Sequence, residues 1–143
     1  MNLLKRKTLS PENLQSTFQL VTCLTKSWNP GAKYVIESDP TLQTILVGTR
    51  NDNLVCRENA SQILLNISQS QDGIKALISS DFNTILSFAK DDPKVFNILN
   101  QVQSNITQSQ SQQSMFFFLF FLSFFPSFFP SFFQTRTKNK CLK

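Results

Sequence analysis

An internal repeat of about 40 residues limits the folds that this chain can adopt. The segment GAKYVIESD at 31–39 aligns with GIKALISSD at 73–81, a spacing of 42 residues, with Gly, Lys, Ile, Ser and Asp shared. The tripeptide TIL follows in both copies, at 44–46 and 84–86. A repeat of this length is typical of stacked units, because each unit leaves an apolar face that only a neighbouring unit can cover.

A second signature occurs three times, as QLVTCLT at 19–25, QILLNIS at 62–68 and QVQSNIT at 101–107. In each copy the glutamine and the fifth residue, Cys or Asn, are four positions apart and therefore share a helix face. An amide side chain both donates and accepts, so a ladder of such pairs could hydrogen-bond the backbone of an extended strand. The alternative is that these amides cap neighbouring helices or face water.

Turn and cap signals between the apolar runs predict short helices and no strands. Ser10, Pro11 and Glu12 supply a cap, a first-turn proline and an acid that favours a helix start. Breaks are expected at Asn29–Gly31, Asp39–Pro40, 51–53, Gly73 and 91–93. The helices predicted from these signals and from apolar spacing are 11–28, 32–37, 41–48, 54–68, 74–79, 82–89 and 94–106.

Residues 29–68 resemble one armadillo-type repeat, including ENA at 58–60 and LNI at 65–67 in its long third helix. Residues 70–107 resemble a second repeat, and residues 11–28 resemble the last helix of a preceding one. The resemblance implies an all-α fold, a right-handed α-solenoid of armadillo-like repeats. In that family the third helices line a concave groove that holds an extended peptide.

The resemblance also implies where such a peptide would bind. In the family a Trp and, four residues later, an Asn project from the third helix; here the Asn positions are Asn66 and Asn105, with Cys23 in the first copy. Glutamine stands at every Trp position, which removes the aromatic slots that grip lysine stems, so a nuclear-import type of cargo is not expected. The expected groove residues are Gln19, Gln62, Asn66, Gln101 and Asn105.

Composition argues against an enzyme. The chain has no histidine, so it lacks an imidazole base and a His-ligated metal, and its three glycines form no phosphate-binding loop. Asp81, Asp91 and Asp92 lie in predicted turns and are interpreted as helix caps and solvated loops, not as metal ligands. We expect no catalytic residues, no metal and no cofactor.

Charge and cysteine content indicate the partner class and the compartment. The basic excess lies at the two ends of the chain, since residues 8–133 carry 7 basic and 9 acidic side chains. We therefore expect a protein or an extended peptide as partner, and no nucleic acid. Three cysteines, far apart, make no disulfide framework or zinc site, and no signal peptide is visible. A cytoplasmic location is expected, with a nuclear one as an alternative.

Five segments are expected along the chain. They are a basic segment at 1–9, helical repeats at 10–107, a disordered polar linker at 108–114, a Phe-rich segment at 115–133 and a basic tail at 134–143.

The Phe-rich segment has three interpretations. As a helix its 19 residues would span about 28 Å, close to the hydrocarbon core of a bilayer. Against a membrane anchor, Pro126 and Pro130 interrupt its second half. In the second interpretation, residues 116–133 are a translated polypyrimidine tract, because they use only Phe, Leu, Ser and Pro, the residues of pyrimidine-only codons; the repeats would then be truncated. The third is a partner-binding or aggregation-prone tail.

The function expected from the repeats is a non-enzymatic scaffold that binds an extended peptide or protein segment along the concave face. The alternative is a membrane-anchored adaptor that uses residues 115–133 as its transmembrane segment.

Overall fold

The computed structural model of the chain describes residues 11–27 and 29–124, and every regular element in this part is helical. The expectation of an all-α fold is therefore confirmed for the described residues. The basic segments 1–9 and 134–143, and residues 125–133 of the Phe-rich segment, lie outside them. The elements are α1 (Pro11–Ser27), α2 (Asn29–Ser38), α3 (Gln43–Gly48), α4 (Leu54–Ile67), α5 (Gln71–Ile78), α6 (Phe82–Phe88), the 3₁₀ turn η1 (Ala89–Asp91) and α7 (Pro93–Phe124).

Each predicted helix is present, but two predicted breaks are wrong. Residues 29–31 open α2, and Gly73 lies in the first turn of α5. Proline is tolerated in a first turn because its missing N–H needs no partner there, which explains why Pro30 does not delay α2. At the start of α5 the Ser70 hydroxyl accepts a hydrogen bond from the Gly73 N–H at 3.0 Å and caps the helix.

The largest correction concerns residues 108–114, which were expected to be a disordered linker. They lie inside α7, which runs without a break from Pro93 to Phe124 and includes the predicted helix 94–106. The linker contains neither proline nor glycine, and glutamine is a good helix former. A helix already nucleated by the apolar turns before it can extend through such residues at little cost.

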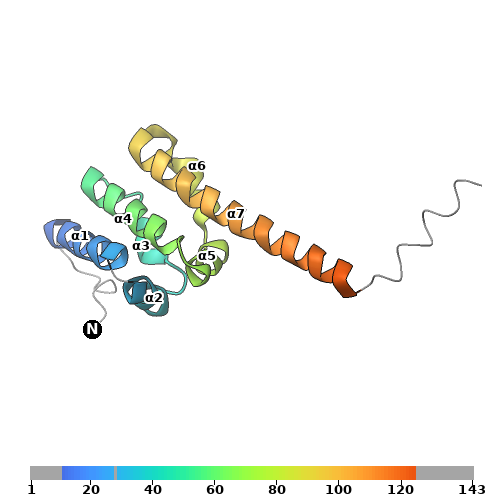
Figure 1. Cartoon of the computed structure of the whole chain (residues 1–143). Coiled ribbons are helices and arrows are strands. Elements are labelled where there is room, and N and C mark those ends of the chain that lie inside the picture. The colour runs from blue at the N-terminus through green and yellow to red at the C-terminus, as the bar shows by residue number, and fades with distance from the viewer. Residues whose placement is uncertain (1–10, 28, 125–143) are drawn as a thin grey trace, which may run out of the picture. The chain divides into compact units, whose positions relative to one another are not determined.

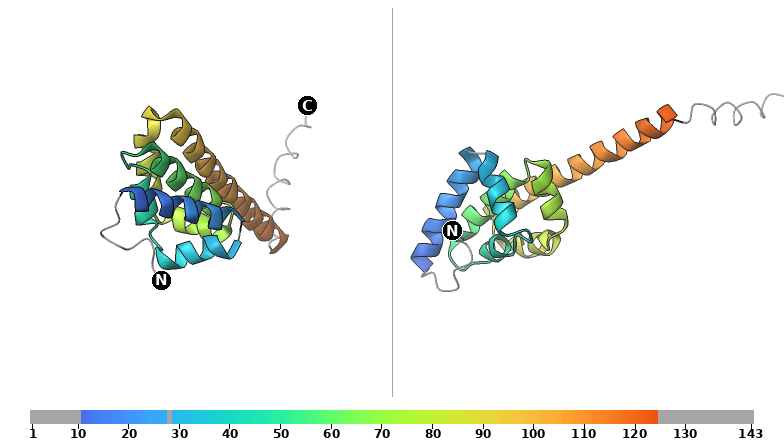
Figure 2. Two further views of the ribbon diagram at one scale, coloured as in Figure 1. Left: turned by 90° about the vertical axis from the view of Figure 1, so that its left-hand side faces the viewer. Right: turned by 90° about the horizontal axis from the view of Figure 1, so that it is seen from below.

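The helices recur in one order, two short and one long, first as α2, α3 and α4 and then as α5, α6 and the start of α7. Helices at equivalent places in successive copies pack on each other, α1 on α4 and α2 on α5, and α3 packs on α4 (Figure 1). The first half of α7 lies beside α4 (Figures 1 and 2), and the Lys94–Glu58 ion pair joins the two helices, as does the bond from Asn105 to Ser68, directly after α4.

One hydrophobic core joins these helices. It contains side chains from α1 to α7 with little or no exposure, and Leu42, Ile45, Ala60, Ile63, Leu64, Ile67, Leu99 and Val102 have none. The buried α7 residues, Val95, Leu99, Val102, Ile106 and Ser109, recur at alternating spacings of four and three, so one stripe of the helix meets the core.

The chain divides into two compact units, Met1–Ser109 and Gln110–Lys143, with the division inside α7. The first unit holds the core and the three signature copies. In the described part of the second unit, residues 110–121 are exposed. They include seven consecutive large apolar side chains, Met115 to Phe121, which are 54–74% exposed.

Candidate functional site

The five expected groove residues lie on the three helices that carry the signature. Gln19 is on α1, Gln62 and Asn66 are on α4, and Gln101 and Asn105 are on α7. They differ in burial. Gln19 and Gln101 are exposed, Gln62 and Asn105 are partly buried, and Asn66 is only 7% exposed.

The amide of Asn66 is engaged in a contact between two signature helices. Its Nδ2 donates to the Thr25 Oγ1 at 3.0 Å and to the Thr22 carbonyl at 3.3 Å, both on α1. Its Oδ1 accepts a hydrogen bond from the Gln62 Nε2, one turn earlier on α4, at 3.2 Å. Asn66 therefore joins α4 to α1, and Gln62 orients it.

The same bond recurs one copy later. The Asn105 Nδ2 on α7 donates to the Ser68 Oγ, directly after α4, at 2.8 Å. Thr25 and Ser68 both hold the last position of the seven-residue signature. Each hydroxyl donates to a carbonyl of its own helix, Thr25 to Val21 and Ser68 to Leu65. Its oxygen can therefore accept a hydrogen bond from the next copy. The asparagine of the second copy and that of the third thus each bond the hydroxyl of the copy before it.

This recurring bond explains why the signature pairs an amide with a hydroxyl two residues later. We name the Asn66–Thr25 and Asn105–Ser68 bonds the amide ladder. The sequence suggested a ladder facing a ligand, with caps or water-facing amides as the alternative; the structure places the two asparagines between helices. Of the five expected groove residues, the glutamines Gln19 and Gln101 are the exposed ones.

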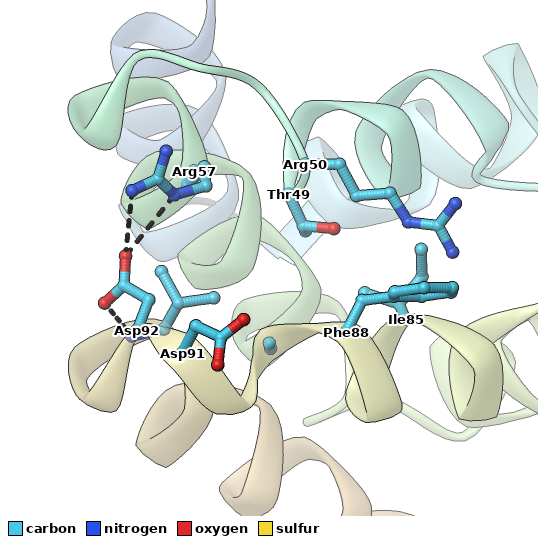
Figure 3. A pocket seen from close by; sticks show the side chains of 9 residues that line it. Thr49, Arg50, Arg57, Ile85, Phe88, Asp91 and Asp92 are labelled. Carbon is cyan, nitrogen blue, oxygen red and sulfur yellow. Dashed lines mark hydrogen bonds and ion pairs between the residues drawn. The ribbon is translucent and has the colours of Figure 1, made fainter.

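The first unit also holds a cavity that the sequence did not indicate (Figure 3). Its volume is about 370 Å³, and it lies between the end of α3, α4, α6, η1 and the start of α7. Its polar lining comes from Thr49, Arg50, Arg57, Asp91 and Asp92, and its apolar lining from Ile85, Phe88, Ala89 and Val95.

Most charges around this cavity have partners within the fold. The Arg57 Nε and Nη2 donate to the Asp92 Oδ2 at 3.3 and 3.2 Å, and its Nη1 donates to the Asn51 and Asp52 carbonyls. The Asp92 Oδ1 accepts from the Val95 N–H at 3.3 Å and caps α7. These contacts join α4 to α7, as the amide ladder does.

On the other side of the cavity the Arg50 guanidinium lies over the Phe88 ring, 4.4 Å from its centre (Figure 3). Phe88 is 62% exposed, so this pair lies at the surface. Figure 3 shows the Asp91 carboxylate between the two pairs. Of the residues around the cavity, the sequence singled out the turn Asp91–Asp92–Pro93. The prediction that Asp92 caps a helix is confirmed.

Two further findings concern the chemistry of the described residues. Cys56 lies in the core on α4 with 1% exposure, and burial raises the pKa of its thiol, which disfavours the nucleophilic thiolate. In the described ranges, no three or more His, Cys, Asp or Glu side chains gather into a group that could hold a metal ion.

Within residues 11–27 and 29–124, no helix combines the length and the apolar character needed to cross a bilayer. Comparison with protein-family models, with curated proteins and with solved structures finds no match to this chain.

Proposed function

We propose that residues 11–109 form an armadillo-type module, a right-handed solenoid of helical repeats without catalytic activity, and that it binds an extended segment of another protein. The binding face would be the one on which α1, α4 and the first half of α7 present their glutamines. In this proposal Gln19, Gln62 and Gln101 contact the ligand, and Asn66 and Asn105 hold the helices that carry them.

The observation that carries the proposal is the recurrence of the amide ladder. Bonds of the same kind between α4 and α1 and between α7 and α4 give successive signature helices a common register. The signature glutamine, four residues before the ladder position, therefore recurs once per helix. Interaxial distances between packed helices are roughly 8–10 Å, and three residues of an extended strand span roughly 10 Å. One glutamine could thus meet every third residue of a bound strand.

The chemistry of the glutamines suits a backbone ligand. An amide donates and accepts, so it can satisfy an N–H and a C=O of a strand irrespective of its side chains. Gln19 and Gln101 are exposed, whereas Gln62 gives its Nε2 to Asn66. The Gln62 Oε1 would then accept a hydrogen bond from a ligand N–H.

A display library of random linear peptides tests the proposal. The full chain should enrich binders, and Gln19→Ala/Gln62→Ala/Gln101→Ala should weaken them at least about tenfold, since each amide contact is worth about 1 kcal/mol. The matched control is Gln43→Ala/Gln69→Ala, which removes two exposed glutamines outside the signature. Enrichment of no peptide, or equal loss in the control, would contradict the proposal.

A further inference from the structure

We propose that residues 115–121 assemble three or more copies of this chain, by packing against the same segment of the other copies. The inference concerns the second unit and does not depend on the proposed function of the first. It starts from the seven consecutive apolar side chains of α7 described above.

The exposed apolar area is too large for an isolated helix. Five phenylalanines, Met115 and Leu119 are each more than half exposed. With roughly 200 Å² for a fully exposed aromatic side chain, they present roughly 800 Å² of apolar surface. The largest apolar patch of a typical monomer is about 300–600 Å², and a stable interface needs about 800 Å² from each partner. The segment therefore offers enough area for an interface.

The distribution of these side chains sets the number of copies. Seven consecutive residues occupy all seven positions of a heptad, so the helix is apolar in every direction. A two-helix contact covers a seam of about two positions in seven. A dimer would leave most of the segment exposed to water, whereas a bundle with more neighbours around each helix covers more of it.

Charge favours other copies of this chain over a lipid surface. Residues 95–124 contain no charged side chain, so parallel copies of the helix meet no like-charge repulsion. A helix that lies on a membrane surface needs a polar, usually basic, face opposite its apolar one. Residues 115–121 have no such face.

The first experiment measures the mass of the full chain by light scattering coupled to size exclusion. The wild type should have at least three times the monomer mass of 16.3 kDa. Phe116→Gln/Phe117→Gln/Phe120→Gln/Phe121→Gln should return it to the monomer, because glutamine keeps the helix propensity and removes the apolar surface. The matched control, Leu20→Gln/Val47→Gln/Ile78→Gln/Phe88→Gln, changes four exposed apolar residues of the first unit and should stay assembled.

The second experiment identifies the contacting segment. In a Cys23→Ser/Cys141→Ser background, the exposed positions Ser114 and Ser104 are each replaced by cysteine and oxidised. Cross-links between copies are expected from Ser114→Cys and not from Ser104→Cys.

Three results would overturn the inference. One is an unchanged assembly in the four-glutamine variant, and another is cross-linking at position 104 in place of 114. The third is a wild-type chain with less than three times the monomer mass; if that chain also floats with phosphatidylcholine vesicles, the segment is assigned to a lipid surface.

Discussion

Gly73 is required where α5 begins because another backbone passes beside it. A Cβ built at this position would lie 1.9 Å from the carbonyl oxygen of Ile67, the last residue of α4. Gly31 holds the equivalent place in α2 and is also buried. Gly73 therefore permits the turn from α4 into α5.

We predict that Gly73→Ala destabilises the first unit by about 3 kcal/mol, because a backbone carbonyl cannot move aside as a side chain can. In thermal unfolding the midpoint should fall by more than about 10 °C. Lys75→Ala on the same helix is the control, since this side chain is 70% exposed and its loss should change stability by less than about 0.5 kcal/mol. Equal midpoints for Gly73→Ala and wild type would show that α4 and α5 are not packed this closely.

The buried thiol of Cys56 makes the free energy of unfolding depend on pH. Burial raises the pKa of this thiol above its usual 9.0, so the folded state favours the neutral form. Its contribution to stability is complete below the unfolded pKa and is lost as pH rises through the folded pKa. The stability difference between wild type and Cys56→Ala should therefore shrink as the pH rises above about 9, by at most about 1.4 kcal/mol per pH unit. Chemical denaturation at several pH values measures it, and parallel curves would refute it.

At the scale of elements, the amide ladder couples helices that are about 40 residues apart in sequence. Because Asn66 is buried, loss of its side chain leaves the Thr25 hydroxyl with one partner fewer and the Gln62 amide without its acceptor. Asn66→Ala should cost more than Asn105→Ala, whose side chain is only partly buried.

A double-mutant cycle tests this coupling directly. Thr25→Val combined with Asn66→Ala should show a coupling energy of about 0.5–1.5 kcal/mol in denaturant unfolding, since the two side chains share one bond. Thr107→Val combined with Asn66→Ala is the control. Thr107 has the same place in the third copy, and its hydroxyl, like that of Thr25, donates to a carbonyl of its own helix; Asn66, however, donates to Thr25 and not to Thr107. If the changes in the free energy of unfolding are additive in both cycles, the Asn66–Thr25 bond does not couple the two helices.

Sequence patterns predicted the helices well where a cap and an apolar period agreed, as for α4, whose predicted range of 54–68 differs from Leu54–Ile67 by one residue. They failed at 108–114, where polar composition was interpreted as disorder although every residue there permits a helix. They also did not settle the surroundings of the signature amides. Periodicity shows that Gln62 and Asn66 share a face, but not whether that face meets another helix or solvent, which depends on the packing of residues from other copies.

At the scale of the whole molecule, the two units differ in what stabilises their helices. Residues 93–106 of α7 contribute four side chains to the core of the first unit, whereas the side chains of residues 110–121 are exposed. A helical segment of this length whose side chains are exposed is marginal in water, because its backbone bonds barely offset the entropy of ordering it. The same continuous helix should therefore have two levels of stability, separated near Ser109.

Hydrogen exchange should resolve these two levels. In the four-glutamine variant, which we expect to be monomeric, amides of residues 93–106 should be protected as strongly as those of α4, because both belong to one core. Amides of residues 112–121 should exchange nearly as fast as in an unfolded peptide. In the wild type, packing against other copies should slow exchange at 112–121 as concentration rises, with little change at 93–106. Uniform protection along α7 in the monomeric variant would show that residues 112–121 need no partner to remain helical.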